Sequence, residues 1–124
     1  MFTDTKAFSS FSVNDIPAAR AFYGDTLGLK VTEVDDLLRL ETSGGHQVMV
    51  YPKDDHMPAS FTVLNFAVDD IEAAVDDLTG RGITFERYPQ YPADDKGIVR
   101  GDMPGAIAWF TDPAGNVLSV MQES

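Results

Sequence analysis

Two histidines and one glutamate are the side chains of this sequence that are best placed for proton transfer. His56 lies in a polar, loop-like segment, and an imidazole there could act as a general base near neutral pH. His46 follows a glycine-rich turn, where exposure to solvent is the expected state. Glu41 stands two residues after Arg39 in a stretch with strand character, so the two side chains share one face and could orient a ligand or transfer a proton. Glu41 and His56 are therefore the catalytic candidates, with a structural salt bridge and a solvated loop as the alternatives.

Other kinds of catalytic centre are excluded by what the sequence lacks. It has no cysteine, and therefore no thiol nucleophile, disulfide or thiolate metal ligand. It also has no P-loop, dinucleotide fingerprint, G-x-S-x-G or H-E-x-x-H motif. Nine basic against twenty acidic residues give a net charge of −11, which repels nucleic acids and anionic membranes and would favour a cationic ligand. No apolar run approaches the roughly 20 residues that span a bilayer. With no signal peptide at the start, we expect a cytoplasmic protein that binds neither nucleic acid nor membrane.

The elements that position these side chains follow from an internal repeat. The string VNDIPAA begins at Val13 and the string VDDIEAA begins at Val68. Each carries a residue suited to cap a helix, Asn14 or Asp15 in the first and Asp69 or Asp70 in the second. Apolar residues follow at helical spacing, which predicts helices over residues 15–27 and 70–80. Strand character is found at residues 7–13, 29–34, 37–41, 47–51, 62–68, 84–88, 107–111 and 117–122, and less regularly at 98–100. The sequence therefore predicts one α+β domain over residues 1–124, made of two βαβββ modules, about 1–54 and 60–124, with pseudo-twofold symmetry.

Two motifs give this pattern a family resemblance. AFYGDTLGL runs from Ala21 to Leu29, and DPAGN runs from Asp112 to Asn116 before the last predicted strand. In these places, and with the repeat between them, the sequence resembles the vicinal-oxygen-chelate (VOC) superfamily, which includes glyoxalase I, bleomycin-resistance proteins, fosfomycin-resistance enzymes and extradiol dioxygenases. The resemblance implies paired modules that form a partly open barrel around a cleft, and it implies a homodimer.

In the metal-dependent members of that superfamily, four inward-facing strand positions supply His, Gln or Glu ligands. The resemblance places these positions at Phe8, Met49, Val63 and Ser119. Divalent cations of this kind prefer imidazole or carboxylate donors, whereas Phe and Val have no donor atom and Met and Ser are poor ligands for hard ions. No His, Asp or Glu occurs in residues 7–11, 48–51, 62–66 or 117–122, so a small shift of the alignment does not restore the set. We therefore expect no metal ion and no other cofactor.

Strand alternation gives the lining of the expected cleft. The lining is apolar and aromatic with a few polar groups, as in most small-ligand pockets. Its predicted members are Phe8, Ser10, Arg39, Met49, Tyr51, Val63, Asn65, Tyr91, Arg100, Trp109 and Ser119. Trp109 could stack on a planar ligand or only bury its ring, and Tyr91 and Arg100 could cover a ligand from a long loop or be plain surface. A barrel filled by its own side chains is the alternative to an open cleft.

The sequence thus predicts a glyoxalase/bleomycin-resistance-like protein that lacks the usual metal ligands and binds a small organic molecule in the cleft between its modules. The alternative is an enzyme of the same superfamily, a lyase, isomerase or dioxygenase. It would use unusual metal ligands or a metal-free acid–base mechanism through Glu41 or His56. A third hypothesis is an interaction or assembly domain. Whether the protein catalyses a reaction stays open at this point.

Overall fold

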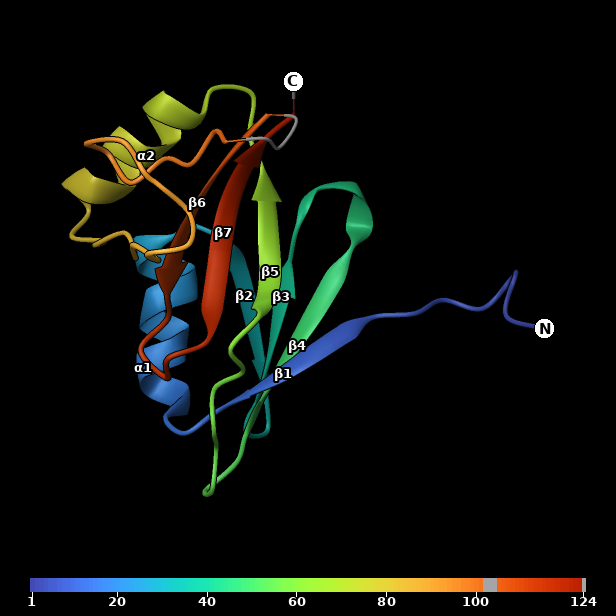
Figure 1. Ribbon diagram of the computed structural model, residues 1–124. Helices are drawn as coiled ribbons and strands as arrows, with labels where there is room; N and C mark the ends of the chain where they lie inside the picture. Colours follow the sequence, from blue (N-terminus) through green and yellow to red (C-terminus); the bar gives the residue numbers. More distant parts are fainter. Residues whose placement is uncertain (102–104, 124) are drawn as a thin grey trace. The chain divides into compact units, whose positions relative to one another are not determined.

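The computed structural model describes residues 1–101 and 105–123, and the chain divides into two compact units, Met1–Met57 and Pro58–Ser124 (Figure 1). Each unit contains one small sheet and one helical segment, which confirms the predicted α+β class. None of the helices among the described residues has the length and apolar character needed to cross a membrane.

The first unit is a four-stranded sheet with a helix on one face. Its elements are β1 (Ser9–Val13), α1 (Ile16–Arg20), the π-helix η1 (Ala21–Thr26), β2 (Lys30–Val34), β3 (Leu37–Glu41), the short 3₁₀ turn η2 (Ser43–Gly45) and β4 (Gln47–Pro52). The strand order is β1-β4-β3-β2, with β1 parallel to β4 and the other pairs antiparallel. Each predicted strand of this half is present, and the first begins at Ser9 rather than at residue 7.

Helix α1 begins as the sequence predicts and ends differently. The carboxylate of Asp15 accepts a hydrogen bond from the backbone N–H of Ala18 at 3.0 Å, which caps the first turn. From Ala21 the backbone widens to π geometry, and Leu27 N–H donates to the carbonyl of Phe22 at 2.9 Å. The predicted helix over residues 15–27 is therefore confirmed in extent, although its second half is not an α-helix.

The core of the first unit lies between this helix and the sheet. Tyr23, Leu38 and Leu40 are fully buried there, and the ring of Phe11 lies 5.9 Å from that of Tyr23. Since side chains alternate along a strand, the residues next to these in sequence lie on the opposite face of the sheet. That opposite face, which the helix does not cover, is called the open face of each sheet below.

The second unit has a three-stranded sheet, β5-β7-β6, and one helix. Its elements are β5 (Thr62–Ala67), α2 (Ile71–Gly80), β6 (Ala106–Thr111) and β7 (Val117–Gln122). Asp70 caps α2 through the backbone N–H of Ala73 at 3.1 Å, as the repeat predicts. Ile71, Val75, Phe110 and Leu118 are buried between α2 and the sheet.

The expected fourth strand of this unit is absent from the described residues. Residues 84–88 form a single bridge, in which Glu86 N–H donates to the carbonyl of Trp109 at 2.7 Å. At Ile107, two residues before Trp109 on β6, the bridge partner is instead Val99. Residues 98–100 likewise contribute only Val99, which bridges to Ile107 and to Ala93. The prediction of a regular strand at 84–88 was therefore wrong.

Candidate ligand-binding site

The open face of the first sheet carries three of the predicted lining residues in one row. Ser10 lies opposite Met49 across the β1–β4 pair, and Met49 lies opposite Arg39 across the β4–β3 pair. Tyr51 lies one step along β4, opposite Ser12. Met49 and Tyr51 are half-buried and Arg39 is exposed. The register therefore brings Ser10, Met49, Arg39 and Tyr51 together on one face, and their role in binding a ligand stays a prediction.

The pair expected between Arg39 and Glu41 takes another form. In the described part of the chain, the Glu41 carboxylate forms its ion pair with Lys30 across the β2–β3 ladder, with an N–O distance of 3.4 Å. Lys30 is largely exposed, so this pair contributes little to stability. Glu41 is therefore a surface-paired carboxylate at the end of β3, between Lys30 on β2 and Gln47 on β4.

His56 has a specific partner that the sequence did not indicate. Its Nδ1 lies 2.6 Å from the hydroxyl oxygen of Ser12, 44 residues earlier in the chain. Both residues are half-buried. The two are far apart in the sequence, and only the return of the chain after β4 to the end of β1 brings them together.

In the second unit, two tyrosine rings lie against the ring of Trp109. The ring of Tyr88 lies 5.4 Å from that of Trp109 at a steep angle, and the ring of Tyr91 lies 5.5 Å from it with a tilt of 40°. The indole N–H donates to the hydroxyl of Thr62 at 3.2 Å, which fixes the orientation of the ring. We call Tyr88, Tyr91 and Trp109 the aromatic cluster.

A polar pair lies beside this cluster on the same sheet. Ser119 is opposite both Asn65 on β5 and Trp109 on β6, and its hydroxyl donates to the Asn65 carbonyl oxygen at 2.5 Å. Ser119 is fully buried, whereas Asn65 is exposed. The Asn65 amide group thus offers N–H donors at the edge of an aromatic surface, which suits recognition of a planar ligand with an acceptor atom.

The long loop before β6, predicted as a possible lid, is fastened at Asp94. One carboxylate oxygen of Asp94 accepts hydrogen bonds from Lys96 N–H at 2.9 Å and Ile98 N–H at 3.0 Å, and the other pairs with Arg100 at 2.7 Å. Burial alone would raise the pKa of this carboxyl, but the hydrogen bonds from Ile98, Arg100 and Lys96 together hold the pKa below its ordinary value. Arg87 also donates to the backbone carbonyls of residues 94 and 95.

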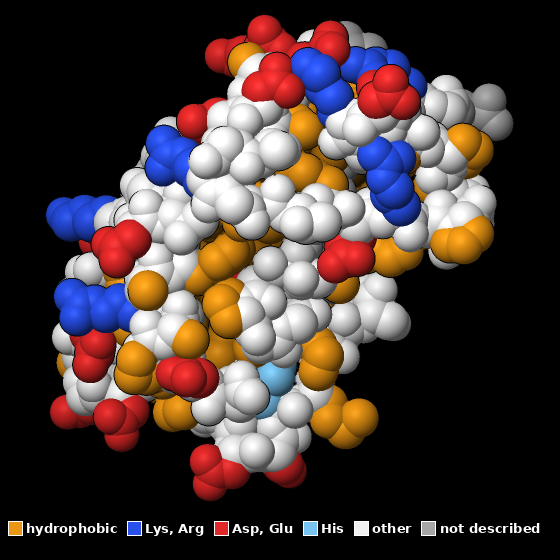
Figure 2. Space-filling model, turned by 90° about the vertical axis from the view of Figure 1, so that its left-hand side faces the viewer, with side chains coloured by type: hydrophobic (Ala, Val, Ile, Leu, Met, Phe, Trp, Pro, Cys, Tyr) orange, Lys and Arg blue, Asp and Glu red, His pale blue; other side chains and the backbone are white. Residues whose placement is uncertain are grey.

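Further ion pairs attach this loop to α2, beside which it runs in Figure 1. Lys96 pairs with Asp76 at 2.9 Å, and Arg100 approaches Glu72 at 3.8 Å. On the face drawn in Figure 2, basic side chains lie beside acidic ones in the same way. Arg100 is thus part of the attachment of the loop, while Tyr91 from the same loop reaches the aromatic cluster.

The four positions that the resemblance relates to metal ligands carry no suitable donor set. Phe8 is 62% exposed just before β1, Met49 lies on the open face of β4, and Val63 lies where the register between β5 and β7 shifts. Ser119 is engaged with Asn65. Over residues 1–101 and 105–123, no group of three or more His, Asp or Glu side chains is close enough to hold an ion. The residues at these positions do not fit a divalent cation.

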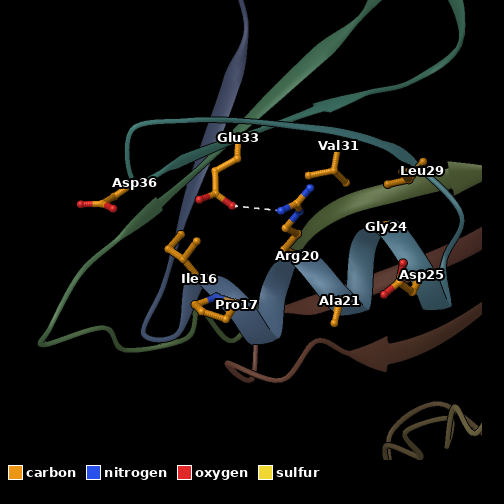
Figure 3. A pocket seen from close by; sticks show the side chains of 10 residues that line it. All are labelled: Ile16, Pro17, Arg20, Ala21, Gly24, Asp25, Leu29, Val31, Glu33 and Asp36. Carbon is orange, nitrogen blue, oxygen red and sulfur yellow. Dashed lines mark ion pairs between the residues drawn. The ribbon is translucent and has the colours of Figure 1, made fainter.

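Two hollows of the first unit lie apart from Ser10, Met49 and Arg39 on the open face of its sheet. A hollow of about 690 Å³ lies on the helix side, between α1 with η1 and the edge strand β2, and Figure 3 shows the Arg20–Glu33 ion pair of 3.5 Å within it. A second, of about 560 Å³, lies at the glycine turn before β4. Of the predicted lining residues, only Phe8 borders either hollow.

Sequence reasoning missed Ser12 as a partner of His56, Tyr88 as a member of the aromatic cluster, and Asp94 as the residue that fastens the loop. The string Asp94-Asp95-Lys96-Gly97 was the available signal for the last, since an aspartate two residues before a backbone N–H often closes such a turn. The other two pairings depend on how distant segments meet, and carry no local signal.

Comparison with known proteins identifies the family. The model of the Glyoxalase/Bleomycin resistance protein/Dioxygenase superfamily matches residues 8–120. None of the curated proteins matches the sequence. Similar solved structures include a glyoxalase family protein from Enterococcus faecalis, with 21% identity, a TM-score of 0.69 and coverage of 98% of this chain and 99% of that one. TnmS3, an antibiotic binding protein from Streptomyces sp. CB03234, has 24% identity, a TM-score of 0.70 and the same coverage. A glyoxalase/bleomycin resistance protein/dioxygenase from Alicyclobacillus acidocaldarius has 19% identity, a TM-score of 0.68 and coverage of 99% and 95%. The chain therefore belongs to the glyoxalase/bleomycin resistance protein/dioxygenase superfamily.

Proposed function

We propose that this protein binds a small planar organic molecule at the aromatic cluster and does so without a metal ion. The observation that carries the proposal is the cluster itself, in which Tyr88 and Tyr91 flank Trp109 beside the Asn65 amide. Aromatic rings at these separations favour insertion or stacking of another ring, worth about 0.5–1.5 kcal/mol for each pair. The structural similarity to TnmS3, an antibiotic binding protein, also supports binding of a small molecule.

The proposal that no metal is needed rests on the chemistry of the donor atoms at the four positions. Phe8 and Val63 cannot ligate, and Ser119 and Met49 would be poor ligands for a hard ion. Without an ion, the shared mechanism of the metal-dependent relatives has no basis in this chain. The site would then serve to sequester a ligand, with shape and stacking as the source of affinity.

The charge of the protein suggests which planar compounds bind best. A net charge of −11 attracts cations and repels anions at low ionic strength. We therefore expect a cationic planar compound to bind more tightly than an anionic compound of similar size, with a difference that shrinks as salt is added.

The experiment uses the fluorescence of Trp109, which is the only tryptophan in the chain. Acridine orange as the cation and anthraquinone-2-sulfonate as the anion are titrated into the full chain at low and high salt, with free N-acetyltryptophanamide to correct for collisional quenching and absorption. The proposal is supported if quenching of Trp109 saturates and if Asn65→Ala and Tyr91→Ala raise the ligand concentration at which it saturates. Quenching that never saturates, for these and a wider panel of planar compounds, argues against it.

The second candidate function is an enzyme with a metal-free acid–base mechanism. The contact between His56 and Ser12 favours it, because it holds an imidazole in a defined position on the open-face side of β1. Turnover of a superfamily substrate that is lost in His56→Ala or Glu41→Gln would support this function. Equal turnover in those variants would remove it.

We also propose a homodimer. Phe8, Val34, Met57 and Phe61 are exposed although their side chains are large and apolar, and such surface is often covered by a second subunit. Light scattering on the full chain tests this, and a monomer at micromolar concentration would count against it.

A further inference from the structure

Ser12 and His56 make a contact between a hydroxyl and a base that the binding proposal does not use. The distance from Ser12 Oγ to His56 Nδ1 is 2.6 Å, which is at the short end for a hydrogen bond of this type. When the imidazole is neutral and carries its proton on Nε2, the hydroxyl donates to Nδ1. A serine hydroxyl that donates to a neutral imidazole is the arrangement that activates serine as a nucleophile.

The pair is held from both sides by the local fold. His56 N–H donates to the carbonyl of Lys53 at 3.0 Å, and Lys53 N–H donates to the carbonyl of Val13 at 2.9 Å, so the turn that carries the imidazole is bonded to the end of β1. The Lys53 ammonium pairs with Asp55 within the same turn at 2.5 Å. These backbone hydrogen bonds hold the segment that carries His56 next to the end of β1, where Ser12 lies.

The surroundings of Ser12 suit an acyl group. Ser12 lies on the open face of β1, because its neighbours Phe11 and Val13 are buried on the helix side. Tyr51 is directly opposite Ser12 across the β1–β4 pair, and its hydroxyl is a group that can donate to an oxyanion. Ser12 and His56 are both half-buried, so a small reagent can reach them. By contrast, the hydroxyl of Ser119 is bonded to the carbonyl oxygen of an amide, which cannot take its proton.

We propose that Ser12 is a nucleophile activated by His56 and that it accepts acyl groups from small activated esters. Ser12 Oγ attacks the acyl carbon while its proton passes to Nδ1 of His56, and the leaving group departs with that proton. Water then attacks the new ester, gives one proton to His56, and releases the carboxylic acid as Ser12 Oγ takes the proton back. No oxidant, metal or cofactor takes part in either half of this cycle.

The test uses p-nitrophenyl acetate with the full chain. We expect a fast release of about one p-nitrophenolate per chain, an added acetyl group by intact mass, and peptide mapping that places it on Ser12. Ser12→Ala should lose the adduct, and His56→Gln should slow its formation by about 100-fold or more. Ser9→Ala, in the same strand, and His46→Gln, which removes the other histidine, are the matched controls and should react at the rate of the parent protein.

Rescue separates a chemical role of His56 from a structural one. Free imidazole should restore acetylation of Ser12 in His56→Ala, since the small base can enter the space left by the side chain, and circular dichroism reports whether the variant is folded. Acetyl groups found only on lysines or the N-terminal amine, or an unchanged rate in folded His56→Gln, would overturn the proposal. This outcome is independent of the aromatic cluster, because a protein that binds planar compounds without being acetylated would keep the proposed binding function.

Discussion

Removal of the Asp112 carboxylate should destabilise the second unit through its β6–β7 turn. Asp112 is only 4% exposed, and one of its oxygens accepts hydrogen bonds from the backbone N–H groups of Ala114 and Asn116, each at 2.9 Å. The other oxygen accepts from the side-chain amide of Asn116 at 2.9 Å. Asp112 and Asn116 are both buried, so Asp112→Ala removes two buried hydrogen bonds, one to the backbone N–H and one to the side-chain amide of Asn116. At about 1–2 kcal/mol for each buried hydrogen bond lost, the loss is about 2–4 kcal/mol.

For a chain of 124 residues this corresponds to a fall in Tm of roughly 10 °C. Urea unfolding followed by circular dichroism and by the fluorescence of Trp109 measures it, and the denaturant slope should stay unchanged. Asp112→Asn keeps one acceptor oxygen and should cost less than Asp112→Ala. Pro113→Ala alters the neighbouring exposed residue and serves as the control. A change below about 0.5 kcal/mol in Asp112→Ala would show that the carboxylate does not hold the turn, and would refute the reasoning.

Three further predictions concern the loop before β6 and the aromatic cluster. Asp94→Asn should lower stability at pH 7, because the carboxyl pKa is held below its ordinary value of 3.8 in the folded protein. This contribution to stability is complete above the ordinary pKa and is lost as the pH falls through the lower folded pKa, so the urea midpoints of parent and variant should converge as the pH falls below 3.8. Gly97→Ala should cost about 1–2 kcal/mol by the same assay, because φ is 90° there and a Cβ would lie 2.9 Å from Phe85 Cβ. Gly82→Ala, at a φ of 94° with no atom within 4 Å of the added Cβ, should destabilise the protein less than Gly97→Ala. An equal loss of stability in the two variants would show that the contact with Phe85 does not matter. Tyr91→Ala should weaken binding of a stacked planar compound about 5- to 10-fold by Trp109 quenching with no loss of helical signal, and unchanged affinity would remove Tyr91 from the site.

The parts of the fold that could be predicted from the sequence are those with local causes. The repeat predicted a cap at Asn14 or Asp15 and another at Asp69 or Asp70. In the structure Asp15 and Asp70 make the bond to a first-turn N–H. Alternation along residues 37–41 predicted that Arg39 and Glu41 share one face, and in the structure Leu38 and Leu40 are buried on the other. The turn from Asp112 to Asn116 could likewise be predicted, because its side-chain hydrogen bonds join residues no more than four apart in the sequence.

The parts that could not be predicted depend on distant pairings. The run at 84–88 has strand composition, but only Glu86 pairs with β6, at Trp109. Val99 takes the position at Ile107, and composition alone does not show which segment pairs with a given strand. The contact between Ser12 and His56 spans 44 residues and follows from the path of the chain after β4. The π geometry of η1 arises where AFYGDT leaves the α-helical bonding pattern, and periodicity at 3.6 residues does not distinguish the two.

The central claim, metal-independent binding of a planar molecule at the aromatic cluster, is tested most directly by one titration. The full chain is treated with chelator, dialysed, and titrated with acridine orange while the fluorescence of Trp109 is followed, before and after addition of Mn²⁺, Fe²⁺, Ni²⁺ or Zn²⁺. We predict saturable quenching with the same Kd in every condition. Binding that appears only when one of these ions is restored would contradict the claim, and would mean that ligands other than Phe8, Met49, Val63 and Ser119 hold a metal in this protein.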